Sequence, residues 1–185
     1  MLKVCKLTSE RNEQVLFQDL NFTLDAGSWL WVRGSNGAGK STLLKIVAGL
    51  ISPTAGNVLC KTTKFYLGHK LNISAHLTPI ENLKWGIEPF SLCIKEVLKI
   101  LKLTDFENTP CGLLSHGQKQ RVALARLWGY TKKIWILDEP LNGLDAVGQG
   151  LFLERFASHL KQGGSAVIAS HLALGNVIPE NVIHL

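Results

Sequence analysis

Short hydrophobic runs alternate along this chain with longer segments in which hydrophobic residues recur every three or four positions. The first pattern predicts strands and the second predicts helices. Strands are predicted at residues 2–7, 20–24, 29–33, 56–60, 64–67, 134–137, 166–169 and 181–185. Helices are predicted at residues 39–50, 78–103, 117–128 and 146–161. Hydrophobic strands that alternate with helices are typical of a parallel sheet covered on both faces, so an α/β fold is expected.

Turn residues separate several of these elements. A polar turn from Thr8 to Gln14 is expected to join the first two strands. The helix that begins near Gly39 has hydrophobic residues around most of its circumference, which predicts that it is buried. Ser52-Pro53-Thr54 is expected to end it, because proline cannot continue a helix.

Length and composition indicate one soluble domain. The chain has 185 residues, of which 46% are hydrophobic and 18% are charged, so it can bury a core and is not disordered by composition. No stretch approaches the roughly 20 hydrophobic residues that a membrane-spanning helix needs. The first residues, MLKVCKL, alternate like a strand and do not have the pattern of a secretory signal.

The formal net charge is +6, from 20 basic and 14 acidic residues. A basic balance can indicate nucleic acid, an anionic membrane surface or an anionic ligand as a partner. The lysines are scattered, with no block of five or six like charges. This favours an ordinary solvated surface.

The chain has four cysteines, which are Cys5, Cys60, Cys93 and Cys111. They lie far apart and none forms a CxxC pair. Without a secretory signal, they are expected to be reduced and mostly buried, and a disulfide or zinc framework is the alternative.

A glycine-rich sequence between a predicted strand and a predicted helix matches the phosphate-binding pattern G-x-x-x-x-G-K-[ST]. It consists of Gly34, Ser35, Asn36, Gly37, Ala38, Gly39, Lys40, Ser41 and Thr42. Its glycines allow successive N–H groups to point at phosphate oxygens, and the helix adds its positive end. Lys40 can reach the β- and γ-phosphates of ATP, and the Ser41 hydroxyl can ligate Mg²⁺. The alternative, a glycine-rich turn with an incidental lysine, does not explain why all these features coincide.

A strand of hydrophobic residues, 134–137, ends in Asp138 and Glu139. The carboxyl edge of a parallel sheet is where ligands bind. Asp138 is therefore predicted to hold Mg²⁺, and Glu139 to orient and polarise the attacking water. The alternative is a polar strand exit before a turn at Pro140.

Ser115 precedes the helix at 117–128, with Gln118 three residues later. This spacing predicts a capping box. A capped helix alone would explain it. However, a helix N-terminus with a hydroxyl and Gly117 can also bind an anion, which would suit a second copy of the chain.

The order of these features resembles that of the nucleotide-binding domains of ABC transporters, over nearly the whole chain. The matching segments are 34–42, 114–118 (LSHGQ), 138–139, 141–145 (LNGLD) and 170–171. The resemblance implies a single ABC ATPase domain over 1–185, with an N-terminal antiparallel part and a helical subdomain inserted at about 70–128. It also implies ATP and Mg²⁺ as cofactors.

The resemblance further implies a head-to-tail homodimer in the ATP-bound state. ATP would lie between residues 34–42 of one copy and three residues of the other, namely Ser115, Gly117 and Gln118. Asp145 would belong to the loop that communicates across this interface. His171 would contact the γ-phosphate, so the catalytic side chains would be Lys40, Glu139 and His171.

Three positions depart from the general ABC pattern. Arg11 stands where an aromatic residue usually stacks on adenine, although a guanidinium can also stack on a base. His69 stands where a glutamine is usual, and a neutral imidazole is a poor Mg²⁺ ligand. His116 replaces the first glycine of the 114–118 segment, which bears on how closely that loop can pack on ATP.

Within the family, the amino-acid sequence most resembles that of the ATP-binding subunit of the haem exporter in bacterial cytochrome c maturation. The segments that carry this resemblance are 10–13 before 16–17, 65–69, 77–83 and 121–128. It implies a peripheral ATPase on the cytoplasmic face of the bacterial inner membrane, with an integral membrane transporter subunit as partner. Haem is not expected to bind to this chain directly.

Two alternative functions remain. One is an ABC ATPase that serves a different exported substrate. The other is an ABC ATPase associated with nucleic acid, which the basic charge could favour. Against it, only about 70 residues separate Thr42 from Ser115, with no sustained heptads for a coiled coil, and the chain holds one cassette. No nucleic-acid partner is therefore expected.

Overall fold

The computed structural model describes residues 2–11, 13–85, 92–129 and 133–185. The chain forms two compact units. Unit 1 comprises Met1–His69, Lys132–Pro140 and Ala157–Leu185, and unit 2 comprises Lys70–Thr131 and Leu141–Phe156. Unit 2 therefore includes residues 141–156 in addition to the helical segment expected at about 70–128.

An antiparallel sheet in unit 1 has the strand order β2-β1-β4. Its strands are β1 (Leu2–Arg11), β2 (Gln14–Leu24) and β4 (Ala55–Cys60). The turn predicted from Thr8 to Gln14 is too long, because β1 continues to Arg11 and β2 begins at Gln14. The β1–β2 register shifts at three places, and such irregularities interrupt the strict alternation by which a strand is recognised in a sequence.

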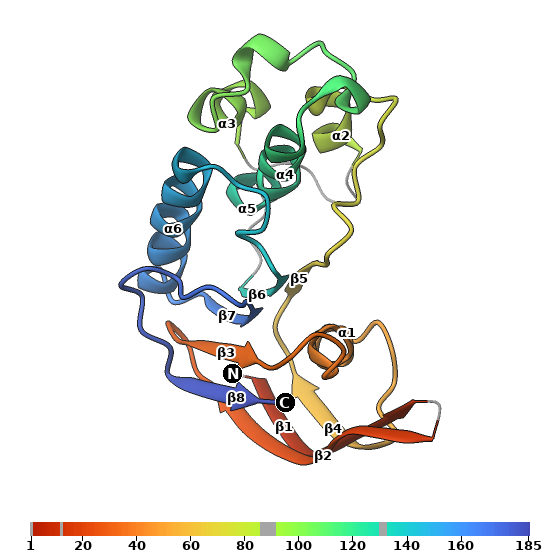
Figure 1. The fold of residues 1–185 in the computed structure, drawn as a ribbon. Coiled ribbons are helices and arrows are strands. Elements are labelled where there is room, and N and C mark those ends of the chain that lie inside the picture. The colour runs from red at the N-terminus through yellow and green to blue at the C-terminus, as the bar shows by residue number, and fades with distance from the viewer. Residues whose placement is uncertain (1, 12, 86–91, 130–132) are drawn as a thin grey trace. The chain divides into compact units, whose positions relative to one another are not determined.

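A five-stranded parallel sheet forms the other part of the unit 1 framework, in the order β5-β6-β7-β3-β8 (Figure 1). Its strands are β3 (Trp29–Arg33), β5 (Lys64–Leu67), β6 (Ile134–Asp138), β7 (Ser165–Ala169) and β8 (Asn181–His184). Both central strands β6 and β7 are buried along their whole length, as their uninterrupted hydrophobic sequences predict. The α/β fold with a parallel sheet is confirmed.

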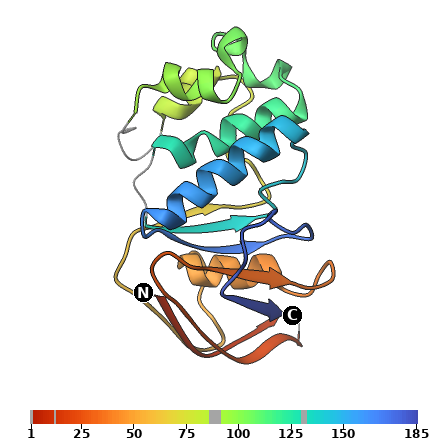
Figure 2. The ribbon, with the colours of Figure 1, turned by 90° about the vertical axis from the view of Figure 1, so that its left-hand side faces the viewer.

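Helix α1 (Lys40–Ala48) lies between the two sheets, and its hydrophobic side chains enter the core of unit 1 (Figures 1 and 2). The predicted burial of this helix is confirmed. It ends at Gly49, whose φ of 82° forms a left-handed C-cap, and not at Ser52-Pro53-Thr54. On the opposite face of the sheet, Trp135 of β6 stacks on His159 of α6 (Ala146–Lys161), with ring centroids 3.7 Å apart.

Unit 2 is helical. It contains α2 (Pro79–Lys84), α3 (Ile94–Ile100), η1 (Thr104–Phe106), η2 (Cys111–Leu113), α4 (His116–Leu124), α5 (Arg126–Gly129) and the first part of α6. The helices predicted over residues 78–103 are α2 and α3, and residues 86–91 lie outside the described residues. The helix predicted at 117–128 is divided at Ala125 into α4 and α5. Leu83, Val97 and Val122 lie in a separate hydrophobic core of this unit.

All four cysteines are free thiols, but the expectation that they are mostly buried is wrong. Cys111 is buried, Cys5 and Cys60 are half-buried, and Cys93 is exposed. Burial raises the pKa of the Cys111 thiol, which therefore stays protonated.

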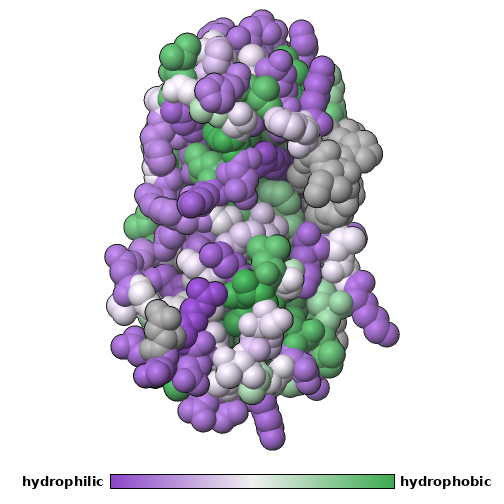
Figure 3. Space-filling model, turned by 90° about the vertical axis from the view of Figure 1, so that its right-hand side faces the viewer, coloured by the Kyte–Doolittle hydropathy of each residue, from purple (hydrophilic) through white to green (hydrophobic). Residues whose placement is uncertain are grey.

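The molecular surface is mixed in character. Figure 3 shows hydrophilic side chains over most of one face, with a hydrophobic area in its lower half. Within the described part of the chain, no helix is long and hydrophobic enough to cross a membrane.

Candidate active site

The phosphate-binding sequence forms a loop between β3 and α1. Gly37 and Gly39 have φ values of 86° and 99°, which favour glycine at these two positions. The loop leads directly into the first turn of α1, where the N–H of Leu43 bonds the carbonyl of Gly39. Backbone of this kind presents N–H groups and a helix N-terminus to an anion, as the sequence predicts.

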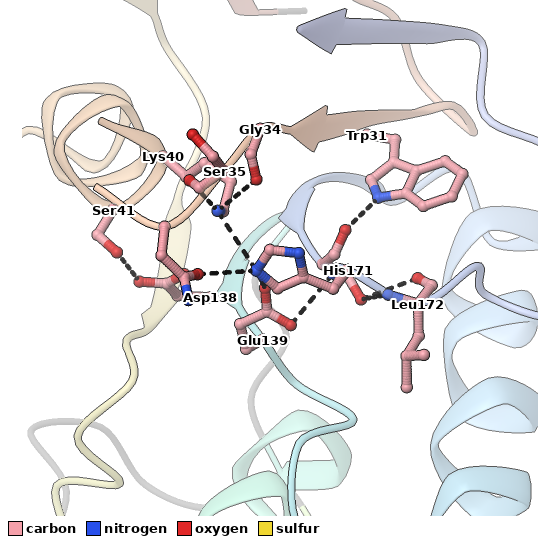
Figure 4. Close-up of polar contacts among 11 residues, drawn as sticks. Trp31, Gly34, Ser35, Lys40, Ser41, Asp138, Glu139, His171 and Leu172 are labelled. Carbon is pink, nitrogen blue, oxygen red and sulfur yellow. Dashed lines mark hydrogen bonds and ion pairs between the residues drawn. The ribbon is translucent and has the colours of Figure 1, made fainter. Parts of the chain in front are cut away.

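The Lys40 side chain folds back over this loop and is only 8% exposed. Its Nζ donates to the carbonyls of Gly34 and Ser35, each at 2.9 Å (Figure 4). The ammonium therefore lies above the loop backbone, where phosphate oxygens bound by the loop would contact it.

Ser41 and Asp138 come together although they are far apart in the chain. The Ser41 hydroxyl donates to Oδ2 of Asp138 at 2.6 Å, and Asp138 is buried. Close by, burial and the negative charge of Asp138 raise the pKa of the Tyr66 hydroxyl, so this side chain of β5 is a neutral phenol. Hydroxyl and carboxylate oxygens are ligands that Mg²⁺ prefers, so the pair fits the predicted metal role.

A metal ion at this pair would need further ligands. Among the described residues, no group of three or more histidine, cysteine, aspartate or glutamate side chains is arranged to hold a metal ion. Mg²⁺ in nucleotide sites is typically bound by one or two protein oxygens together with phosphate oxygens. The Ser41–Asp138 pair fits that arrangement and does not fit a metal site made of protein ligands alone.

Glu139 follows β6 in an unusual backbone conformation, with a φ of 51°. Its N–H bonds the carbonyl of Ala169 at the end of β7, which fixes the residue at the carboxyl edge of the sheet. Its Oε2 accepts a hydrogen bond from the N–H of His171. Its Oε1 is buried and has no hydrogen-bond partner among the described residues, so the hydrogen-bonding capacity of this carboxylate oxygen is unused.

His171 connects the loop with the acidic strand end. Its Nε2 lies 3.2 Å from Oδ1 of Asn36, 3.5 Å from Nζ of Lys40 and 3.5 Å from Oε1 of Glu139 (Figure 4). A hydrogen bond stabilises the turn that carries His171: the indole N–H of Trp31 donates to the carbonyl of Ser170 at 2.8 Å. The structure therefore brings the predicted catalytic residues Lys40, Glu139 and His171 together within unit 1.

A cavity of about 300 Å³ adjoins this cluster. Its lining residues are Arg33, Gly34, Ser170, His171 and His184. Arg33 lies over the Trp31 ring at 4.6 Å. The sequence analysis did not identify Trp31, Tyr66 or Arg33 as parts of the site. The alternation in β3 could have shown that Trp31 and Arg33 share a face.

Ser115 and Gln118 form the predicted capping box at the start of α4 in unit 2. The N–H of Gln118 bonds the Ser115 hydroxyl at 3.2 Å, and the N–H of Ser115 bonds Oε1 of Gln118 at 2.8 Å. This local prediction is confirmed. The roles of Ser115, Gly117 and Gln118 toward the ATP of a second copy remain predictions.

His116 packs closely on Gly143, in the segment that follows β6. A Cβ at Gly143 would overlap the His116 ring, and a Cβ at Gly117 would lie 3.0 Å from the Gly143 carbonyl. His116 therefore fills the space beside Gly143 in unit 2, which explains how this start of the helix accommodates a large side chain where the family pattern has glycine.

Asp145 has a structural role that the sequence analysis missed. Its Oδ1 accepts from the N–H of Gly148 at 2.9 Å, which caps the first turn of α6. Its Oδ2 lies 4.0 Å from Arg121. An aspartate directly before a helix is a recognised capping signal that could have been found in the sequence. Its predicted role across a dimer interface is not tested by this contact.

Two predicted positions, Arg11 and His69, remain to be placed. Arg11 ends β1 opposite Gln14 and is exposed. His69 is also exposed and is the last residue before the chain enters unit 2. The adenine-binding role of Arg11 stays a prediction.

Comparison with known proteins agrees with this geometry. Residues 17–142 match a family described as ABC transporter. The chain is 40% identical to the cytochrome c biogenesis ATP-binding export protein CcmA of Shigella flexneri, over 94% of this chain and 90% of that protein. Its identity to CcmA of Tatumella citrea is also 40%, over 92% of this chain and 88% of that protein.

Solved structures support the fold. An ATP-binding cassette in a dimeric post-hydrolysis state, with ADP and Pi, superimposes with a TM-score of 0.82 at 23% identity. The match covers 100% of this chain and 94% of that chain. The resemblance first noted in the order of the motifs is thus confirmed, and the chain belongs to the ABC transporter family.

Proposed function

We propose that this chain is the ATP-hydrolysing subunit of a bacterial ABC exporter that serves cytochrome c biogenesis. The observation that carries the proposal is the convergence of Lys40, Glu139 and His171 at the carboxyl edge of one parallel sheet. These residues come from three separate segments, so their meeting is a property of the fold.

Each side chain has a distinct task in this proposal. Lys40 binds the β- and γ-phosphates of ATP and stabilises the charge that develops on them. Glu139 orients the attacking water through Oε1, which has no hydrogen-bond partner among the described residues and lies 3.5 Å from Nε2 of His171. His171 holds the γ-phosphate side of the site, and its contacts with Asn36 and Glu139 fix its position.

Ser41 and Asp138 are proposed to hold Mg²⁺, directly and through its water shell. The metal ion supplies charge neutralisation between the β- and γ-phosphates when MgATP is bound. The chain's own contribution is to keep both oxygens 2.6 Å apart at the start of α1 and the end of β6.

The active form is proposed to be a head-to-tail homodimer. Ser115, Gly117 and Gln118 of one copy would complete the nucleotide site formed by residues 34–42 of the other. In support, Ser115 presents its hydroxyl at the N-terminus of α4, where N–H groups favour an anion.

Ser115→Arg is expected to abolish ATP-dependent dimer formation, because a bulky cation replaces the small hydroxyl. Lys40→Ala is expected to be inactive as well. In an equimolar mixture of the two variants, each mixed dimer contains one site with intact Lys40 and intact Ser115, so ATP turnover should partly return. The measurement is ATPase activity of each variant alone and of the mixture.

Ser115→Thr is the matched control, since threonine keeps the capping hydroxyl. It should dimerise as wild type does. A mixture that stays as inactive as the separate variants would show that Ser115 does not act in trans.

The chain is proposed to act at the cytoplasmic face of the bacterial inner membrane. Its partner there would be an integral membrane transporter subunit, and the complex would function in haem delivery. Haem itself is not proposed to bind this chain. The test is affinity purification of the tagged chain from bacterial membranes, followed by identification of the copurifying membrane protein and a haem absorbance spectrum.

A copurifying cytochrome c biogenesis membrane subunit, with haem in the complex, is the expected result. Copurification with the membrane subunit of an exporter for another substrate would instead establish the alternative within the same enzyme class.

A further inference from the structure

The chain enters unit 2 through an irregular segment, Leu71–Thr78, which we call segment 71–78. It contains no helix or strand, so its backbone groups need partners from elsewhere. Six of its eight carbonyls accept hydrogen bonds from unit 2, those of Leu71, Asn72, Ser74, Ala75, Leu77 and Thr78. A segment bound so densely is fixed in one conformation although it has no regular structure.

Asn82 of α2 forms one half of this attachment and is only 4% exposed. Its amide nitrogen lies 3.0–3.1 Å from the carbonyls of Ser74, Leu77 and Thr78. Its Oδ1 accepts from the N–H of Ser74 at 2.7 Å. One buried side chain thus binds the second half of the segment.

Arg126 of α5 forms the other half. Its two terminal nitrogens donate to the carbonyls of Leu71, at 3.2 Å, and Asn72, at 2.8 Å. Asn72 has a φ of 51°, a left-handed conformation that asparagine tolerates better than most residues. The fork of the guanidinium matches two successive carbonyls, which a lysine ammonium cannot reproduce in the same way.

A third attachment comes from the residues just before the Ser115 helix. The N–H of Cys111 bonds the Leu77 carbonyl at 2.8 Å, and the N–H of Gly112 bonds the Ala75 carbonyl at 2.7 Å. Segment 71–78 is therefore bound on both sides of α4, by η2 before it and by Arg126 after it.

We infer that Arg126 and Asn82 are positioning residues that make segment 71–78 and the Ser115 helix move as one rigid body. The segment begins two residues after His69, so a displacement of α4 on dimer closure is passed to the chain that leaves unit 1. This inference rests on the proposed function, because it assigns the path by which closure acts on the membrane partner.

The test uses the complex of the full chain with its membrane partner. Arg126→Gln is expected to lower the kcat for MgATP by about tenfold and to leave KM within about twofold, because misplacing a structure remote from the reacting atoms costs rate. Arg126→Lys should be intermediate, since it keeps the charge and can bond only part of the pair. ATP turnover per assembled complex and thermal unfolding are both measured.

Arg155→Gln is the matched control, because Nε of Arg155 also donates to a backbone carbonyl of unit 2, that of Leu127, at 3.0 Å. It should lower the melting temperature and keep kcat. A purely structural role of Arg126 predicts the same behaviour for Arg126→Gln, and that result would overturn the inference.

Equal losses of kcat in the Arg155 and Arg126 variants would also overturn it. If the wild-type complex fails to hydrolyse ATP, the proposed function is wrong and the inference is wrong with it. If the wild-type complex hydrolyses ATP and the Arg126→Gln complex does so at the same rate, the inference is wrong but the proposed function stands.

Discussion

Lys40→Ala is expected to reduce ATP hydrolysis by at least about 100-fold, the scale on which single charge-stabilising groups act. The ammonium lies over the loop, where it bonds the carbonyls of Gly34 and Ser35 and approaches His171. Its loss removes the positive charge nearest to the phosphates. The measurement is phosphate release at saturating MgATP, together with the nucleotide concentration needed for half-saturation.

The same variant should lose most of the thermal stabilisation that MgATP gives to the wild type. A ligand raises stability in proportion to the logarithm of its concentration relative to Kd, so a weakened site gives a smaller shift. Without nucleotide, the melting temperature should change little.

Lys45→Ala is the control for this experiment. Lys45 lies in the last turn of the same helix, α1. It should hydrolyse ATP and respond to MgATP as wild type does. Turnover by Lys40→Ala at the wild-type rate would refute the assignment of the phosphate loop.

Glu139→Gln is expected to have the second large effect, a loss of hydrolysis of about 100-fold or more with nearly normal MgATP binding. Glutamine has the shape of glutamate but cannot accept a proton from water as a carboxylate does. Because Oε1 of Glu139 has no hydrogen-bond partner among the described residues, the change should disturb few other contacts. Dimers should therefore accumulate with MgATP, as measured by light scattering after size-exclusion chromatography.

Glu154→Gln provides the comparison, since Glu154 is an exposed carboxylate on α6. It should turn over ATP normally and form no long-lived dimer. If Glu139→Gln behaves in the same way, Glu139 is not the residue that activates water.

The sequence is sufficient for the parts of the site whose geometry is local. The loop of residues 34–42 lies between a strand and a helix, and Asp138 and Glu139 end a buried strand, so the chain neighbours alone define their setting. The contact of His171 with Asn36, 135 positions away, depends on the order of strands in the sheet. No periodicity in the sequence shows that order.

Long strands with irregular pairing were the main difficulty in predicting the fold. Lys6 and Asp19 have positive φ values within β1 and β2, and the register between these strands shifts near them. A bulge moves the following side chains to the other face, so the alternation in the sequence ends at residue 7 although the strand continues to Arg11. By contrast, α6 was predicted with its observed limits, because its hydrophobic spacing is uninterrupted.

Side-chain bonds to irregular backbone could not be predicted at all. Asn82 and Arg126 are 44 positions apart in the sequence and bind the same segment from different helices. Such bonds follow from where carbonyls point in three dimensions, and they leave no repeat or spacing in the sequence.

The left-handed backbone at Glu139 limits which amino acids can occupy this position. At a φ of 51°, β-branched residues such as valine, isoleucine and threonine are strongly disfavoured, whereas glycine, asparagine and aspartate are tolerated. In a saturation library at residue 139, some variants would be lost because they fold poorly and give little protein. Others would fold but would fail to hydrolyse ATP. The variants that fold would be small or amide-bearing replacements, and those are the ones from which the contribution of the carboxylate can be measured without a folding defect.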